Sequence, residues 1–179
     1  DSAGNRVQAQ FDALSRWGAG PDSNAPIRWL EVSVKANVDS LGTTVYDLLE
    51  CDTNQVEDNP NDADVTSNVN IHTVNTGVAT FVLDSNRPEL FQSITVDGVD
   101  AYNAGTGGPK ATDNAGVVLT PQVDSFAIER DGPVKVIVKT AGHFTGGTST
   151  CPDETNTPLA YTMRFTFTRG SADVGMEYD

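Results

Sequence analysis

The chain has 179 residues, of which 25 are acidic and 11 are basic, so its formal net charge is −14. Hydrophobic residues make up 37%, and the 16 glycines bring the apolar share into the usual range of about 45–50%, which argues against a disordered chain. Nucleic acids and anionic membranes bind basic surfaces, so the charge argues against both and leaves cations, neutral ligands and basic ligands.

Strand patterns begin near the N-terminus, and no window carries the 3.6-residue period and caps of a helix. No apolar run approaches the roughly 20 residues that a membrane-spanning helix needs. Two dipeptide or tripeptide signals, Asn75-Thr-Gly77 and Asp97-Gly98, predict turns between strands. Alternation of apolar and polar residues predicts the strands of this half at 7–17, 27–34, 43–49, 69–74, 78–83 and 91–96.

The second half repeats the pattern after a glycine-rich loop over 103–116. A second long polar loop is expected over 145–158, and turns are expected at 131–133 and at Gly170. The predicted strands lie at 117–120, 126–130, 134–140, 161–168 and 174–178. About ten short strands at this spacing are typical of an all-β fold, here a single antiparallel β-barrel or sandwich domain over residues 1–179 with long polar loops.

The negative charge is concentrated in one segment. Residues 36–86 carry nine acidic side chains and no Lys or Arg, so they supply −9 of the −14. An acidic loop over 50–64 offers the carboxylate and amide oxygens that Ca²⁺ takes as ligands, although Pro60 interrupts any EF-hand spacing. The candidate calcium ligands are Asp52, Asn54, Glu57, Asp58, Asp62 and Asp64. The alternative for this loop is a solvated acidic surface without a metal.

The two cysteines, Cys51 and Cys151, match no metal-ligand spacing, and each flanks a polar loop. A disulfide between them would close a long loop and restrain the unfolded chain by a few kcal/mol. The alternative is two unrelated thiols. Cysteines in loops of an acidic chain rich in Thr, Asn and Gly favour the disulfide and a secreted protein, extracellular or periplasmic.

Several sequence blocks follow one another along the chain in a recognisable order. The opening blocks are VQAQFDALSRW and IRWLEVSVKANV, followed by GVATFVLDSNRPELFQSITVDG. The later blocks are IERDGPVKVIVKTAGHF and YTMRFTFTRGSADVGMEY. The ordered set resembles the exo-acting rhamnogalacturonan lyase-like (PcRGLX/YetA-like) family. The resemblance implies an N-terminal RIFT-type β-barrel domain of a larger secreted protein that acts on polysaccharide, with catalysis expected mainly in a separate helical domain. The acidic insertion and the two cysteines depart from the family pattern.

Arg16, Trp17, Arg28 and Trp29 are the candidate carbohydrate-binding residues. An indole can stack on a sugar ring, and an arginine can pair with a uronate carboxylate through two hydrogen bonds. The alternative, which the usual burial of aromatic residues favours, is that both tryptophans pack in the core or across strands.

No catalytic residues are predicted. His143, Tyr161 and Arg164 are the residue types that a polysaccharide β-elimination needs, but nothing in the sequence brings them together. No G-x-S-x-G or phosphate-binding loop occurs. The function expected is therefore a non-catalytic accessory or scaffold module of a polysaccharide lyase-like protein, with polysaccharide and adjoining domains as partners. The alternative is a structural or adhesive subunit of a self-assembling extracellular structure.

Overall fold

The computed structural model describes residues 6–18, 20, 23–48, 63–87, 89–102, 108–146 and 159–179. Throughout these ranges the regular secondary structure is β, with eleven strands and no helix. None of the described residues therefore forms a helix that could cross a membrane. The all-β, antiparallel fold expected from the sequence is confirmed.

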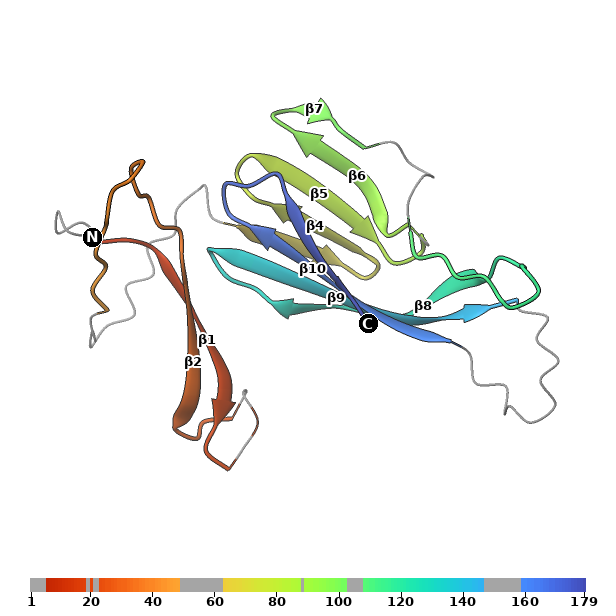
Figure 1. Ribbon diagram of the computed structural model, residues 1–179, viewed down its shortest axis with the longest axis horizontal. Coiled ribbons are helices and arrows are strands. Elements are labelled where there is room, and N and C mark those ends of the chain that lie inside the picture. The colour runs from red at the N-terminus through yellow and green to blue at the C-terminus, as the bar shows by residue number, and fades with distance from the viewer. Residues whose placement is uncertain are drawn as a thin grey trace.

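The strands form three antiparallel sheets (Figure 1). A two-stranded hairpin contains β1 (Ala9–Arg16) and β2 (Ile27–Val34). A five-stranded sheet has the order β3 (Asp64–Asn68), β4 (Ile71–Asn75), β5 (Ala79–Asp84), β6 (Phe91–Val96) and β7 (Val99–Asp100). A four-stranded sheet has the order β11 (Val174–Tyr178), β10 (Ala160–Thr168), β9 (Lys135–Thr145) and β8 (Thr120–Arg130).

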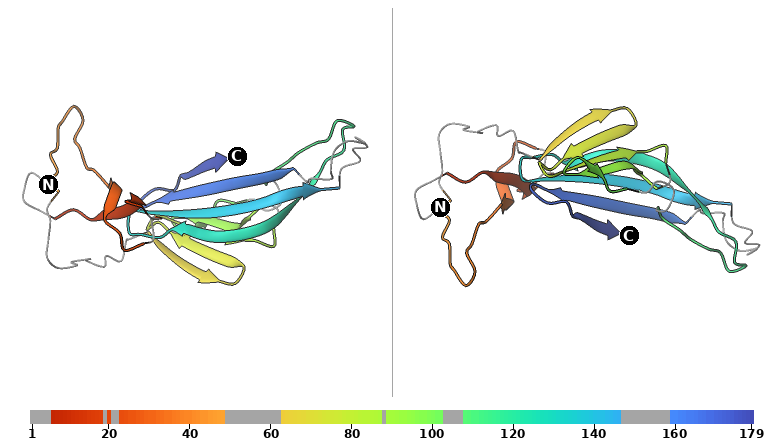
Figure 2. Two further views of the ribbon diagram at one scale, coloured as in Figure 1. Left: turned by 90° about the horizontal axis from the view of Figure 1, so that it is seen from below. Right: turned by 90° about the horizontal axis from the view of Figure 1, so that it is seen from above.

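The five-stranded and four-stranded sheets pack face to face as a sandwich, with the hairpin beside one end (Figure 2). Burial alternates along β9 and β10, because successive side chains of a strand point to opposite faces of the sheet. Aromatic contacts join the two layers, as where Phe81 of β5 meets Phe167 of β10 with ring centroids 4.9 Å apart. The buried core consists of Ala63, Val74, Ala79, Phe81, Leu83, Leu90, Val136, Val138, Phe144, Tyr161, Met163, Phe165 and Phe167.

Several predicted elements are confirmed by the structure. Strands β6 and β11 have the predicted bounds. Asp97 and Gly98 both have positive φ, at 49° and 79°, and connect β6 to β7 as a two-residue hairpin turn. The strand predicted at 126–130 lies within the longer strand β8, in which register shifts lie between Val123 and Ser125 and between Ile128 and Arg130. Of the strand predicted at 117–120, only Thr120 belongs to β8.

The strand predicted over 43–49 is wrong across its described residues, 43–48, which are not in a strand. This segment instead folds back locally, since the Tyr46 hydroxyl accepts a hydrogen bond from the Asn37 amide at 2.9 Å. The Thr44 hydroxyl donates to the Asn37 carbonyl at 3.2 Å. Two strands were not expected at all: β3, which begins at Asp64 of the predicted acidic loop, and the short β7.

The hairpin contacts the sandwich through its polar face. Gln10 is buried, and its side-chain oxygen accepts hydrogen bonds from the amides of Val134 at 3.2 Å and Lys135 at 2.8 Å. Glu31 forms an ion pair with Lys135 at 2.7 Å. Gly132 has no room for a Cβ, which would overlap the Gln10 amide. We call these five residues the hairpin dock.

The opposite face of the hairpin is apolar and exposed. Ala9, Phe11 and Ala13 of β1 pair with Val34, Val32 and Leu30 of β2, so all six share one face. Phe11 and the three partners on β2 are exposed to solvent, whereas the pairs Gln10–Ser33 and Asp12–Glu31 on the other face are buried or half-buried. We call the six residues the apolar hairpin face, in which the four larger side chains are exposed and the two alanines are half-buried.

Candidate functional site

The four candidate carbohydrate-binding residues lie together where β1 ends and β2 begins. The Trp17 amide donates to the Pro26 carbonyl at 3.0 Å, and the Arg16 guanidinium donates to the Ala25 carbonyl at 2.6 Å. The Arg28 guanidinium carbon lies 4.9 Å from the centroid of the Trp17 ring, a cation–π distance. Strand pairing places Trp29 opposite Ser15. We call Arg16, Trp17, Arg28 and Trp29 the hairpin-end cluster.

Both indoles of the hairpin-end cluster are exposed. Trp17 is 62% and Trp29 is 63% accessible to solvent, so neither packs in the core described above. Glu31, the acidic residue of β2, pairs with Lys135 at the start of β9. An exposed indole covered on one side by a guanidinium offers the other side of its ring for stacking. The arrangement suits a sugar ring with a neighbouring negative charge.

The calcium and disulfide predictions fall almost entirely outside the described residues. Asp64 is the first residue of β3, and it is exposed. Within the described ranges, no three His, Cys, Asp or Glu side chains lie close enough together to hold a metal ion. The residues outside the description are Asp52, Asn54, Glu57, Asp58, Asp62, Cys51 and Cys151. Calcium and the disulfide both stay predictions.

The three residues considered for β-elimination lie in the four-stranded sheet but do not share one face. Tyr161 is buried on the inner face, where burial raises the pKa of its hydroxyl, which donates to the Gln122 carbonyl at 3.0 Å. His143 and Arg164 alternate onto the outer face. His143 contacts Asp124 at 2.7 Å, and Arg164 contacts Glu129 at 2.8 Å.

Arg164 has a structural role on the outer face of the sheet. It donates to both carboxylate oxygens of Glu129, at 2.8 and 3.3 Å, and lies 3.9 Å from Glu177 and 3.6 Å from Asp179. The hydrogen bond from Arg164 lowers the pKa of Glu129. This cation therefore holds acidic groups of β8, β11 and the residue after β11 together, and its charge is already matched by carboxylates.

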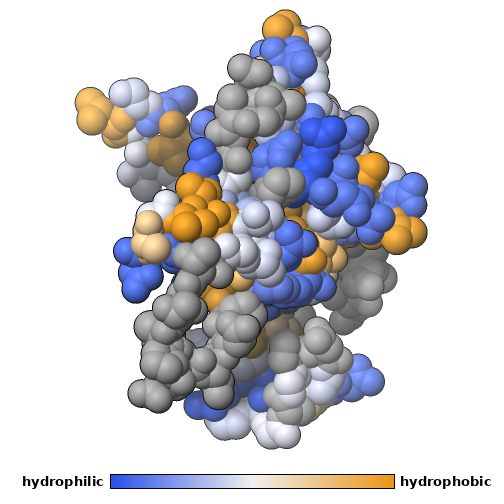
Figure 3. All heavy atoms as spheres, turned by 90° about the vertical axis from the view of Figure 1, so that its right-hand side faces the viewer, coloured by the Kyte–Doolittle hydropathy of each residue, from blue (hydrophilic) through white to orange (hydrophobic). Residues whose placement is uncertain are grey.

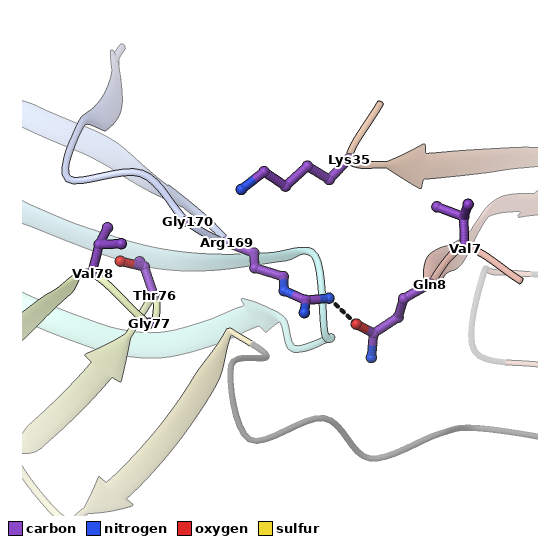
Figure 4. Close-up of a pocket in the computed structure, with 8 residues that line it drawn as sticks. All are labelled: Val7, Gln8, Lys35, Thr76, Gly77, Val78, Arg169 and Gly170. Atoms are coloured by element: carbon purple, nitrogen blue, oxygen red, sulfur yellow. Dashed lines mark hydrogen bonds between the residues drawn. The ribbon is translucent and has the colours of Figure 1, made fainter. Parts of the chain in front are cut away.

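A second candidate site lies at the junction of the hairpin and the sandwich (Figure 4). It is a groove of about 400 Å³ between the ends of the hairpin strands and two turns of the sandwich, the β4–β5 turn and the β10–β11 turn. Its lining residues are Val7, Gln8, Lys35, Thr76, Gly77, Val78, Arg169 and Gly170. We call it the junction groove.

Hydrogen bonds between the two sandwich turns build the floor of the junction groove. The Gly170 amide donates to the Thr76 carbonyl at 2.7 Å, and the buried Thr76 hydroxyl donates to the Ser171 carbonyl at 2.7 Å. Arg169 extends from its turn to Gln8, to which its guanidinium donates a hydrogen bond. Lys35 reaches over Gly170, whose φ of 67° and missing side chain leave space for the ammonium group (Figure 4).

Sequence reasoning missed the junction groove. Its residues come from four separate segments, none of which carries a known ligand-binding motif. The signal available was limited to Lys35 and Arg169 as two of only 11 basic residues, and nothing in the pattern of strands indicates that they lie on one groove.

The described residues seen from the end of the sandwich away from the hairpin are mostly hydrophilic, with hydrophobic ones in separate patches (Figure 3). Both candidate sites, by contrast, involve the hairpin.

Comparison with known proteins identifies a family whose model matches most of the chain. The family model described as the PcRGLX-like protein central beta sandwich domain matches residues 63–179, which begin just before β3 and end just after β11. No curated protein matches the chain. The match coincides with the two packed sheets, whereas the hairpin and its end cluster precede it. It does not test the expected N-terminal RIFT-type barrel, which stays a prediction.

Proposed function

The chain belongs to the PcRGLX-like family, and from this membership we propose that it is a non-catalytic carbohydrate-binding module of a secreted polysaccharide lyase-like protein. The observation that carries the proposal is the hairpin-end cluster, in which two tryptophans are exposed and one is stacked with an arginine. Exposed apolar side chains that are grouped together often mark ligand-binding surfaces, and sugar rings present the flat C–H faces on which indoles stack.

The ligand class proposed is an acidic polysaccharide of the pectic type. Arg28 lies against the Trp17 ring, and Arg16 adjoins the same residue in the chain. A uronate sugar stacked on an indole would bring its carboxylate within reach of a guanidinium, which forms paired hydrogen bonds with carboxylates. The net charge of −14 would repel such a ligand elsewhere, so positive side chains are expected where it binds.

Intrinsic fluorescence offers a direct test, because Trp17 and Trp29 are the two tryptophans of the chain. Addition of rhamnogalacturonan or galacturonan oligosaccharides should change the tryptophan emission in a saturable way. Trp17→Ala and Trp29→Ala should each weaken binding by about tenfold, in line with stacking energies of roughly 1–1.5 kcal/mol. Tyr178→Ala, which removes an exposed aromatic residue of the sandwich, is the control.

If the wild-type chain binds and both tryptophan variants bind equally well, the hairpin-end cluster is not the binding site. If the chain binds none of a series of pectic and marine uronans, only a scaffold role is left. The same incubations report on catalysis. Release of unsaturated uronides, seen as near-ultraviolet absorbance, would overturn the non-catalytic assignment.

A second candidate function is a subunit of an extracellular assembly. The apolar hairpin face favours it, because a monomer rarely exposes a contiguous row of residues such as Phe11, Leu30 and Val32. The mass of the native species separates the two candidates: a defined oligomer that persists on dilution speaks for the assembly, and a chain that dissociates to monomer on dilution speaks for the module.

A further inference from the structure

We propose that the junction groove is a second binding site, which holds the carboxylate of an acidic sugar between Lys35 and Arg169. The inference rests on the proposed function for its class of ligand, but on different residues for its site. The groove is formed by residues of both the hairpin and the sandwich. The family match covers only the sandwich side of the groove, and the hairpin-end cluster shares no residue with it.

The charge of the groove is opposite to that of the chain. Acidic residues outnumber basic ones by 25 to 11, yet the lining contains two cations and no Asp or Glu. Among the described residues, Lys35 has no carboxylate within ion-pair distance, whereas Arg87, Lys135 and Arg164 all do. A positive groove on a negative protein concentrates anions locally.

The groove is also suited to a sugar rather than to a bare anion. Val7 and Val78 line it beside the cations and provide apolar surface for the C–H face of a ring. The Gln8 amide, which already accepts a hydrogen bond from Arg169, provides a polar group that can bind a hydroxyl. This combination of apolar walls with a few convergent polar groups is typical of small-molecule sites at junctions between structural units.

The position of Lys35 depends on Gly170. A Cβ at Gly170 would overlap the Lys35 ammonium, so a larger residue would force the ammonium to shift. The Gly170 amide donates a hydrogen bond to the Thr76 carbonyl, which joins the two sandwich turns. The Lys35 ammonium therefore lies directly over the joined turns, where a bound carboxylate would meet it.

The test is titration of the whole 179-residue chain, followed by amide nuclear magnetic resonance, with short oligogalacturonides. We expect saturable shifts at Lys35, Gly77 and Gly170. Neutral galactan oligosaccharides of the same length should leave these amides unshifted. Acetate and inorganic phosphate, tested separately, should shift them only at much higher concentrations, and equal affinity for acetate would show a simple anion site and overturn the proposal.

Matched lysine variants provide the decisive comparison. Lys35→Gln should weaken the groove shifts by about tenfold or more, because a charge-assisted hydrogen bond contributes roughly 1.5–3 kcal/mol. Lys110→Gln makes the same charge change on an exposed lysine outside the groove and should leave the affinity unchanged. If Lys35→Gln retains full affinity in a folded protein, the proposal is wrong.

Trp17 variants separate binding at the junction groove from binding at the hairpin-end cluster. Trp17→Ala removes binding at the hairpin-end cluster but should leave the groove shifts in place. If oligogalacturonides bind and Trp17→Ala abolishes every shift, the proposed function holds and the junction groove is not a site. If no acidic oligosaccharide binds the wild-type chain, both proposals fail.

Discussion

His72 is a titratable side chain placed inside an apolar core. It lies on β4 with 8% of its surface exposed, and its ring stacks on Phe126 with centroids 4.5 Å apart. Neither ring nitrogen has a hydrogen-bond partner among the described residues. Burial lowers the pKa of His72, because a charged imidazolium is poorly solvated there. The residue therefore packs as a neutral aromatic ring.

This burial predicts an acid-sensitive contribution to stability. The unfolded chain binds the proton with the ordinary histidine pKa of about 6.5, and the folded chain binds it only at lower pH. The contribution of neutral His72 to the free energy of unfolding is therefore fully present above about pH 6.5. It is lost as the pH falls toward the folded-state pKa, by up to about 1.4 kcal/mol per pH unit. His72→Phe should remove this contribution, as measured by urea unfolding between about pH 5 and 6.5. Parallel pH profiles for both proteins would refute the prediction.

Thr76 and Thr140 are both fully buried but differ in their hydrogen bonds. The Thr76 hydroxyl donates to the Ser171 carbonyl at 2.7 Å and accepts from the Ala79 amide at 3.2 Å. The Thr140 hydroxyl has no partner among the described residues. Leaving a buried polar group without its hydrogen-bond partner lowers the free energy of unfolding by about 1–3 kcal/mol. Replacing an unpaired buried hydroxyl by a methyl group changes that free energy little or raises it.

The pair gives a matched prediction. Thr76→Val should lower the free energy of unfolding by about 1–3 kcal/mol, and Thr140→Val should leave it unchanged or raise it. Thr76→Ser keeps the hydroxyl and should therefore lower the free energy of unfolding less than Thr76→Val does. Chemical unfolding of the three variants measures this, and equal losses for both valine substitutions would count against the hydrogen-bond assignment.

At the scale of elements, the hairpin depends on the sandwich for its position. An isolated two-stranded hairpin is marginally stable in water. Here β1 contributes Gln10 and β2 contributes Glu31 to the hairpin dock, both directed at the start of β9. The absence of a side chain at Gly132 allows the close approach. The dock therefore fixes the position of the hairpin, and with it the hairpin-end cluster, relative to the sandwich, and so brings together the two halves of the junction groove.

Gln10→Ala should release the hairpin. It leaves the amides of Val134 and Lys135 without their acceptor, at a cost of about 1–3 kcal/mol for each amide that stays buried. Hydrogen exchange should then accelerate in 9–16 and 27–34 more than in β9 and β10, because the core of the sandwich is untouched. Gln122→Ala, at an exposed position of β8, is the control. Unchanged exchange in the hairpin would contradict the role of the dock.

At the scale of the whole molecule, apolar and charged surfaces are separated. The sandwich buries its apolar residues between two sheets and presents charged rows such as that around Arg164 outside. The hairpin does the reverse, because its polar face meets the sandwich and the apolar hairpin face meets solvent. Two free strand edges and an apolar face make the hairpin the part of the described structure most prone to association.

The isolated chain is therefore expected to self-associate as its concentration rises. Phe11→Thr combined with Val32→Thr keeps strand-forming residues but removes the apolar pair at the centre of the face, and should shift the chain to monomer. Sedimentation velocity over a range of concentrations measures the effect. Val69→Thr, at a highly exposed position in the turn between β3 and β4, should not change it. A wild-type chain that is monomeric at every concentration would contradict the prediction.

Much of the fold could be predicted because strands that are buried on one face alternate apolar and polar residues along the sequence. The bounds of β6 and β11 and the Asp97-Gly98 turn followed from alternation and turn chemistry alone. The segment 43–48 carried the same alternation without becoming a strand, since a strand also needs a partner for its backbone hydrogen bonds. Strand β7 was missed because two residues are too few to show a period.

The sequence by itself determined that this protein is all-β, strongly acidic and related to a polysaccharide lyase-like family, because composition, alternation and ordered motifs are local properties of the chain. It also singled out the four residues of the hairpin-end cluster. Only the tertiary structure decided that Trp17 and Trp29 are exposed and that Lys35 and Arg169 line the same groove. Exposure and long-range proximity depend on how sheets pack, and the pattern of residues along one strand does not record which surface covers it.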